Sequence, residues 1–229
     1  MGLLAKLQRL QRTGMIGMAA RGAIGAQFSR VGEAIGSERL TYNRWTFDMF
    51  HRLAVETAPA IVAGILRRFP QTQRVVDLGA GTGAHVAAFQ KRGLACTGYE
   101  YSPMAREIAA DRLGVTIQPF DLTEDEPWDG ERYDLALSLE VGEHLPPALG
   151  DKLVATCVQA APHVLFSAAP PGQGGQGHIN EQPKAYWIER FARHGYRLDE
   201  AQTAALVTDL RRELVRGMHL ARNVMIFSG

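Results

Sequence analysis

The feature of this sequence that most constrains its fold is a repeating alternation, beginning at residue 74, of short apolar runs and helix-like stretches. Each apolar run has the length of a strand, and helical periodicity follows most of them, which is typical of a parallel sheet joined by crossover helices. The alternation predicts an α/β fold with seven strands. The expected strands are 74–79, 95–100, 115–120, 133–139, 163–168, 196–200 and 221–227.

Helices are expected between these strands and before the first of them. Their ranges are 84–92, 103–113, 147–161, 183–194 and 203–216, and residues 41–69 read as helical, with Pro59 between two halves. We expect residues 41–229 to form the main domain and residues 1–40 a basic N-terminal extension or lid. In residues 1–12, leucines share one face of a helix and basic residues the other. This segment is therefore a candidate for contact with a membrane surface or another subunit, or for packing on the domain.

Charge and cysteine content narrow the class of protein. Residues 1–32 hold five of the 25 basic residues and no acidic one, which leaves 20 basic against 24 acidic residues, a net charge of −4, in 33–229. Affinity for nucleic acid depends on neutralising phosphates, so we expect no nucleic-acid partner.

The two cysteines form no CxxC pair, and no apolar run reaches the ~18 residues that span a bilayer. We expect a cytoplasmic location.

A glycine-rich turn follows the first expected strand. The segment 75–83 reads VVDLGAGTG, and such glycines let the backbone turn tightly and approach a ligand at the start of a helix. The segment also satisfies the dinucleotide-binding pattern G-x-G-x-x-G/A through Gly79, Gly81 and Ala84. The turn alone therefore leaves the ligand open.

Two carboxylates separate the options. Asp77 lies two residues before Gly79, where it would repel a pyrophosphate but would suit a cationic ligand. Glu100 ends the second expected strand, 21 residues beyond Gly79, where a carboxylate accepts hydrogen bonds from a ribose diol. The ligand implied has a ribose and a positive charge and needs no phosphate.

On these residues the sequence resembles the class I S-adenosylmethionine-dependent methyltransferases, over roughly residues 74–200 and onward through the last expected strand. The resemblance implies a Rossmann-like, mostly parallel sheet of seven strands with a reversed last strand and helices on both faces. It also implies S-adenosylmethionine as cofactor. The residues expected to bind this cofactor are Asp77, Gly79, Ala80, Gly81, Gly83, Glu100, Tyr101, Asp121, Leu122 and Glu140.

The methyl acceptor is expected beside the end of the fourth strand, because ligands of such sheets lie beyond the carboxyl ends of the strands. Glu140, Glu143 and His144 follow that strand, and His178 lies in a glycine-rich loop after the fifth. The Glu-x-x-Glu-His pattern is similar to one in ubiquinone-pathway O-methyltransferases and small-RNA 2′-O-methyltransferases, some of which use it, with a further histidine, to hold a divalent metal. We expect Glu143, His144 and His178 to be catalytic, with His178 or His144 as general base.

The sequence thus predicts a methyltransferase that transfers a methyl group to an oxygen atom of a small molecule. One competing function is that of an RNA 2′-O-methyltransferase with a divalent metal at Glu140, Glu143, His144 and His178, and whether a metal binds stays open. The sequence also leaves open a nicotinamide-dependent oxidoreductase and a non-catalytic binding protein. The remaining histidines are isolated in the sequence, and we assign them no chemistry, although His85 follows the glycine turn closely enough to touch a cofactor.

Overall fold

The computed structural model describes residues 26–32, 34, 41–125, 128 and 130–229. The chain divides into two compact units, with the boundary between Phe50 and His51. In the first unit, the buried hydroxyl of Ser29 donates a hydrogen bond to the Thr41 carbonyl (2.9 Å) and accepts one from the Asn43 side chain (2.9 Å). The amphipathic segment expected over residues 1–12 lies outside the described residues.

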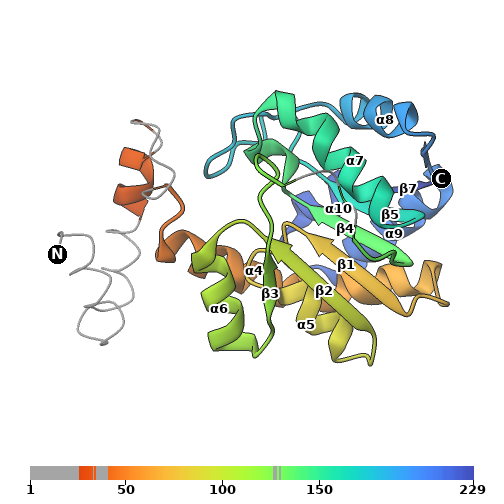
Figure 1. Cartoon of the computed structure of the whole chain (residues 1–229), viewed down its shortest axis with the longest axis horizontal. Helices are drawn as coiled ribbons and strands as arrows, with labels where there is room; N and C mark the ends of the chain where they lie inside the picture. Colours follow the sequence, from red (N-terminus) through yellow and green to blue (C-terminus); the bar gives the residue numbers. More distant parts are fainter. Residues whose placement is uncertain (1–25, 33, 35–40, 126–127, 129) are drawn as a thin grey trace. The chain divides into compact units, whose positions relative to one another are not determined.

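The second unit contains one seven-stranded sheet, shown in Figure 1. Its order is β3-β2-β1-β4-β5-β7-β6, and β7 runs antiparallel to both of its neighbours while β1 to β5 pair in parallel. This confirms the expected Rossmann-like α/β fold with a reversed last strand. The strands are β1 Arg74–Leu78, β2 Ala95–Glu100, β3 Ile117–Pro119, β4 Leu135–Leu139, β5 His163–Ser167, β6 Arg197–Leu198 and β7 Met225–Ser228.

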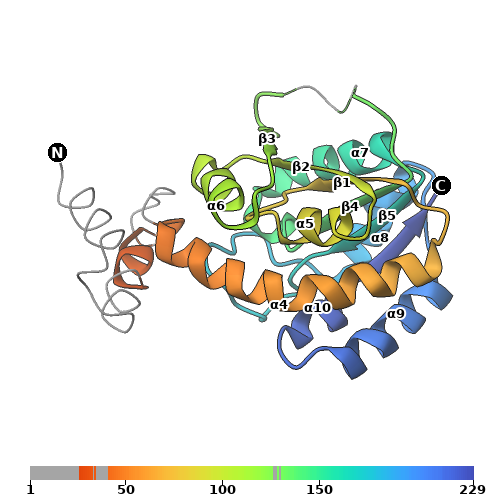
Figure 2. The ribbon, with the colours of Figure 1, turned by 90° about the horizontal axis from the view of Figure 1, so that it is seen from below.

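Helices cover both faces of this sheet. They are α4 Arg44–Arg68, α5 Ala84–Gln90, α6 Pro103–Leu113, α7 Gly150–Ala160, α8 Lys184–Arg193, α9 Glu200–Glu213 and α10 Met218–Asn223, with short 3-10 helices η1 Gly142–His144 and η2 Pro147–Leu149. One hydrophobic cluster joins α4, α5, α9 and α10 to the sheet, and a second joins α7 and α8 to its other face. Figure 2 shows α4, α9 and α10 together on one side. Successive residues of the central strands lie alternately in the two clusters. These strands are therefore apolar on both faces.

The helix expected over residues 41–69, with Pro59 between its halves, is confirmed as α4, which runs unbroken from Arg44 to Arg68. Proline removes one backbone hydrogen bond and crowds the preceding turn. Here Ala58, Ile61, Val62 and Ile65 are buried against the sheet, and this packing holds the helix together across the proline. By length and composition α4 would also be able to cross a membrane, although the sequence shows no unbroken apolar run of that length. Of that apolar stretch, 39% is buried inside the protein.

The expected strand 221–227 is wrong at its start. The chain is helical through Asn223, at the end of α10, and the strand begins at Met225. Leu220, Ala221 and Val224 are buried in the first cluster, so buried apolar positions continue from the end of the helix into the strand. Periodicity alone does not separate the two in so short a run.

Candidate functional site

The glycine turn brings together two parts of the sheet edge. The amides of Gly79 and Ala80 both donate to the Tyr99 carbonyl at 2.9 Å, which fixes the turn to the end of β2. Gly79 has φ +82°, and a Cβ atom placed there would collide with the side chain of Val141. Only glycine therefore fits at this point, where the turn after β1 touches the segment after β4.

Glu100 fastens this turn from the end of β2. Its Oε2 accepts a hydrogen bond from the Gly81 amide (2.9 Å), and its Oε1 accepts one from the Ser102 amide (2.8 Å). Burial raises the pKa of the carboxyl, and these amide hydrogen bonds oppose the rise. Each carboxylate oxygen keeps a further lone pair, so the geometry is compatible with the predicted bonds to a ribose diol.

Asp77 is a buried carboxylate next to the turn. Its side chain is 1% exposed, and Oδ2 has no hydrogen-bond partner among the described residues. Burial, followed by the negative charge of Glu100, raises its pKa to about 7. His85 Nδ1 lies 3.8 Å from Oδ2, but burial lowers the pKa of His85 to about 4, so at neutral pH the imidazole gives no positive charge. A buried carboxylate of this kind is costly without a cation, which fits the cationic ligand that the sequence predicted.

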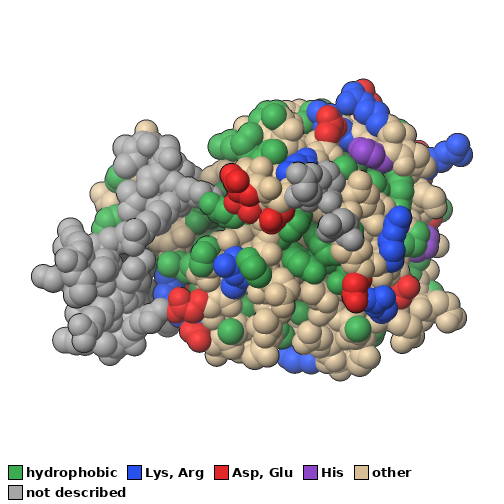
Figure 3. Space-filling model, in the orientation of Figure 1, with side chains coloured by type: hydrophobic (Ala, Val, Ile, Leu, Met, Phe, Trp, Pro, Cys, Tyr) green, Lys and Arg blue, Asp and Glu red, His purple; other side chains and the backbone are tan. Residues whose placement is uncertain are grey.

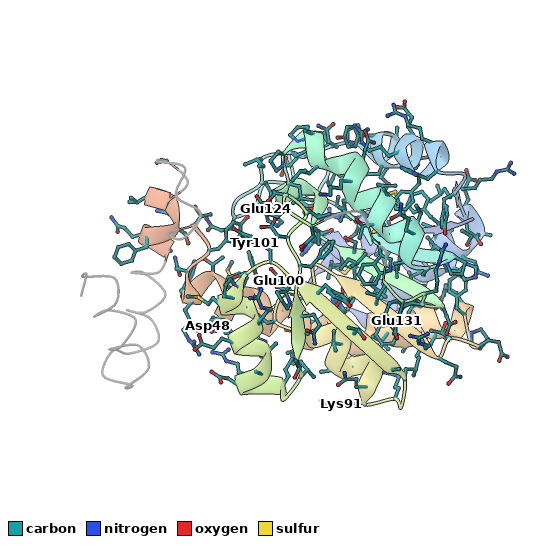
Figure 4. All side chains as sticks on the ribbon, in the orientation of Figure 1. Asp48, Lys91, Glu100, Tyr101, Glu124 and Glu131 are labelled. Carbon is teal, nitrogen blue, oxygen red and sulfur yellow. The ribbon has the colours of Figure 1, made fainter. Side chains whose placement is uncertain are left out.

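The other predicted cofactor residues lie at the ends of β2 and β3. Figure 4 shows Tyr101 beside Glu100, and its side chain is 51% exposed. Asp121 follows β3, and its Oδ1 accepts hydrogen bonds from the Thr123 amide (2.8 Å) and hydroxyl (2.6 Å), which lower the pKa of the carboxyl. Leu122 is partly buried against the second hydrophobic cluster. Asp121 thus has a local role in its own turn that the sequence analysis did not predict.

Glu140, directly after β4, is the only non-glycine residue with positive φ (+54°) in the described part of the chain. Its amide donates to the carbonyl (3.0 Å) and the hydroxyl (3.1 Å) of Ser167. Its carboxylate accepts from Asn223 Nδ2 at 3.2 and 3.3 Å and from Gln173 Nε2 at 3.4 Å. Such backbone strain persists only where the surroundings enforce it, and it occurs often at functional sites.

Glu143 and His144 lie in η1, immediately beyond. The side chain of Glu143 is fully buried, and neither carboxylate oxygen has a hydrogen-bond partner among the described residues. Burial and the nearby charge of Glu140 raise the pKa of this carboxyl. His144 Nδ1 lies 3.2 Å from the Gly177 carbonyl, to which it donates, and burial followed by the proximity of His178 lowers its pKa to about 4.

The loop after β5 brings His178 to the same point. The amides of Ile179 and Asn180 donate to the Glu143 carbonyl at 2.9 and 3.0 Å, and the rings of His144 and His178 lie 5.0 Å apart between centroids. One ligand atom from each of Glu143, His144 and His178 lies within 4.8 Å of the others. The three predicted catalytic residues therefore meet.

Glu140 does not belong to this group, which corrects the predicted four-residue metal set. Its carboxylate is held instead by the amides of Asn223 and Gln173. Asn223 is 2% exposed, and the sequence analysis missed it because it was placed inside an expected strand. In the sequence, Asn223 stands beside Arg222 between apolar residues, and nothing there points to Glu140.

Two further contacts were missed. His51 Nδ1 lies 2.9 Å from the Thr82 hydroxyl, and both side chains are buried, so α4 braces the glycine turn. Glu181 accepts a hydrogen bond from His178 Nδ1 at 2.8 Å. For His51 the sequence held no signal, because its partner lies 31 residues away.

Comparisons with known proteins match this architecture. A family described as "Methyltransferase domain" matches residues 48–172, more than half of the chain. A ubiquinone biosynthesis O-methyltransferase of Alkalilimnicola ehrlichii is 30% identical over 120 residues, which are 50% of this chain and 44% of that relative. The chain thus aligns with less than half the length of this relative.

Solved structures share the fold at low sequence identity. DesVI of Streptomyces venezuelae is 15% identical, with a TM-score of 0.60 over 80% of this chain and 96% of that one. The sugar N-methyltransferase KedS8 of a Streptoalloteichus species is 14% identical, with a TM-score of 0.58 over 80% and 92%. A TehB-like methyltransferase of Corynebacterium glutamicum is 18% identical, with a TM-score of 0.56 over 92% and 98%.

Proposed function

The chain belongs to the class I S-adenosylmethionine-dependent methyltransferase family, and from this premise we propose that it methylates an oxygen atom of a small molecule. The observation that carries the proposal is the convergence of Glu143, His144 and His178 within 4.8 Å at the carboxyl end of β4. This group follows Val141, the residue that touches the glycine turn at Gly79. A donor at the turn and an acceptor at the cluster would therefore be neighbours.

The residues around the turn fit the donor. S-adenosylmethionine, when bound, supplies a methyl group on a positively charged sulfur and needs no further activation. The Oδ2 atom of Asp77, which has no hydrogen-bond partner among the described residues, favours a positively charged ligand, and Glu100 has lone pairs for ribose hydroxyls. Tyr101, exposed beside Glu100, is suited to pack against an adenine ring. Gly79 to Gly83 allow the backbone to approach the ligand closely.

His178 is the residue best arranged to take a proton from the acceptor hydroxyl. The Glu181 carboxylate only accepts hydrogen bonds, so His178 Nδ1 carries the hydrogen and Nε2 keeps a lone pair. A positioned base contributes about 10²–10⁴ in rate. Alignment of the acceptor by the neighbouring Glu143 and His144 would lower the barrier further, by up to about 7–11 kcal/mol in well-oriented systems.

The competing functions are less well supported. Family membership disfavours a nicotinamide-dependent oxidoreductase and a non-catalytic binding protein. For an RNA substrate, a basic surface would be expected. On the face of the described residues seen in Figure 3, lysine and arginine side chains are scattered among acidic ones. The relative with 30% identity is named for a small-molecule pathway.

The proposal is tested by donor binding and product detection. Isothermal titration calorimetry should detect S-adenosylmethionine binding, and mass spectrometry should detect a mass gain of one methylene group in a hydroxyl-bearing member of a small-molecule panel. S-adenosylhomocysteine in place of the donor is the control and should give no product. Binding of a nicotinamide dinucleotide without binding of S-adenosylmethionine would overturn the proposal. Products methylated only at nitrogen or carbon would overturn the oxygen assignment.

We propose as a second candidate that the cluster holds a divalent metal ion. Glu143, His144 and His178 form an N/O donor set that suits Zn, Fe or Mn, and both imidazoles donate through Nδ1 to an oxygen, as metal-ligating histidines do. The partnerless Glu143 carboxylate fits a cation equally well. Such an ion would lower the pKa of a hydroxyl bound to it.

Removal of divalent ions distinguishes the two candidates. With a metal, dialysis against EDTA should abolish turnover, and one divalent ion should restore it. Metal analysis of Glu143→Gln should then show a reduced metal content, with Glu189→Gln, an exposed position on α8, as control. Turnover that is indifferent to EDTA would exclude the metal and leave the histidine base.

A further inference from the structure

We propose that Glu181 is a positioning residue for His178: its carboxylate sets the orientation of the imidazole and holds the glycine-rich segment 172–178 in the shape that carries it. This inference rests on the proposed function, which gives His178 its part in the reaction. Glu181 is outside the group formed by Glu143, His144 and His178 and acts on the acceptor only through His178.

The contacts of Glu181 are concentrated on one short segment. Its Oε1 accepts hydrogen bonds from the Gly174 amide (2.7 Å) and from His178 Nδ1 (2.8 Å), and its Oε2 accepts one from the Gly172 amide (2.8 Å). Hydrogen bonds to a charged acceptor are about twice as strong as those between neutral groups. A single side chain thus ties the beginning of the segment to its end.

Gln173 also holds the beginning of this segment, because its side chain donates to the Glu140 carboxylate (3.4 Å) and accepts a hydrogen bond from Asn223 Nδ2 (3.0 Å). Gly172 and Gly174 have φ of +82° and +68°, and a Cβ atom at either would meet no other atom within 4 Å. The far end is fastened differently, because Asn180 donates through its side chain to the Gly142 carbonyl at 3.3 Å. Residues 179 and 180 would therefore stay attached to η1 without Glu181, whereas the turn leading to His178 would lose two of its amide contacts.

The imidazole also has a defined neighbour on its other side. A Cβ atom at Gly175 would collide with the ring of His178, so the backbone of the segment lies directly against the ring. Gly175 is not in the left-handed region. A methyl group there would therefore displace the ring without straining the backbone. The ring is held between Glu181 and Gly175, which makes its orientation a property of this segment.

The test compares Glu181→Ala, Glu181→Gln and Gly175→Ala with His178→Ala. For histidines that bind a metal, loss of the carboxylate that orients the ring costs about 10–100-fold in metal affinity or activity, and we take this range for His178. We expect that loss in kcat for Glu181→Ala and Gly175→Ala, with the KM for the donor unchanged. Glu181→Gln keeps one acceptor oxygen and should recover part of the rate.

NMR should detect the Nδ1–H tautomer of His178 in the wild type and its loss in Glu181→Ala. Glu189→Ala on α8 is the control and should match the wild type.

Each failure has its own signature. Wild-type turnover in His178→Ala would remove the proposed role of His178 itself, whatever the Glu181 variants do. Reduced turnover in His178→Ala together with wild-type kcat in Glu181→Ala and Glu181→Gln would overturn the role of Glu181 alone. If Glu181→Ala does not fold, Glu181→Gln and Gly175→Ala decide. Wild-type kcat in both would overturn the proposal, and a reduced kcat with an unchanged donor KM would support it.

Discussion

The proposed donor side and the proposed acceptor side of the sheet edge are built in different ways. On the donor side, one stretch of chain from β1 to the start of α6 supplies the glycine turn and Glu100, which are joined by backbone amides. On the acceptor side, the segment after β4 meets the loop after β5 and α10. The Glu140 carboxylate accepts from the side chains of Gln173 and Asn223, and the amides of Ile179 and Asn180 donate to the Glu143 carbonyl. A site held by backbone contacts within one stretch of chain is specified by a short sequence motif. A site assembled from distant segments can change its residues without changing how the donor is bound.

Each side contains one carboxylate with hydrogen-bond donors and one with an oxygen atom that lacks a partner in the described part of the chain. Glu100 on the donor side is satisfied by two amides, and Glu140 on the acceptor side by two side-chain amides. Asp77 and Glu143, one on each side, have oxygen atoms without a partner among the described residues. The comparison therefore predicts that variants of the two sides separate donor affinity from turnover, unless they disturb the point where the sides touch.

The largest separation is expected for His178→Ala. Loss of a positioned base should lower kcat about 10²–10⁴-fold, while the donor affinity stays at the wild-type value because the donor side is untouched. Stopped-time product assays and calorimetry measure the two quantities. His194→Ala, at the exposed end of α8, is the control. An equal fall in donor affinity would show that the two sides are not separate.

Gly79→Ala should break the separation, because Gly79 is where the sides touch. A left-handed backbone costs an alanine about 1–2 kcal/mol, and overpacking against Val141 adds about 1–3 kcal/mol. Both donor affinity and kcat should fall, and urea denaturation should reveal the loss of stability. Gly93→Ala is the matched control, since φ there is +80° but no atom lies within 4 Å of the added carbon. Equal losses in the two variants would refute the role of Val141.

Glu100→Ala should act on the donor side alone. Hydrogen bonds to a charged group are each worth about 1.5–3 kcal/mol, so donor binding should weaken by about tenfold to a hundredfold. Turnover at saturating donor should stay close to that of the wild type. Calorimetry checks the affinity, with Glu107→Ala on the exposed side of α6 as control. Unchanged affinity for S-adenosylmethionine would contradict the assignment.

The effect expected of Asp77→Asn lies in the pH dependence of stability. The pKa of Asp77 is raised from 3.8 to about 7 in the folded chain, so between these values the folded state binds more protons than the unfolded state. The contribution of Asp77 to the free energy of unfolding therefore falls as the pH rises, by at most about 1.4 kcal/mol per pH unit. Without donor, Asp77→Asn should gain stability relative to the wild type from pH 4 to 7. Parallel curves by urea denaturation would refute this.

The donor side and the sheet were predictable from the sequence because their signals are local. The glycine turn, Asp77 and Glu100 lie at fixed positions after apolar runs, and the periodicity of those runs predicts the strands. The sequence failed at Asn223, where the buried end of a helix leads directly into a buried strand. The helical pattern across Pro59 was confirmed, because tertiary packing holds α4 together through the proline.

The acceptor side was predictable only in part. That Glu143, His144 and His178 meet follows from a rule of topology, since the carboxyl ends of parallel strands lie at one edge. Which group holds the neighbouring Glu140 does not follow, because Asn223 reaches Glu140 across 83 residues of chain. The role of Glu181 depends on the path of the glycine segment, which composition does not specify.

The place of Asn223 also affects how the enzyme matures. It lies at the end of α10, just before β7 inserts between β5 and β6. During synthesis, the donor turn and Glu100 emerge from the ribosome more than a hundred residues before Asn223 does. The contact between Glu100 and the glycine turn is therefore available early in synthesis. The hydrogen bond from Asn223 to Glu140 forms only after this late segment has been translated.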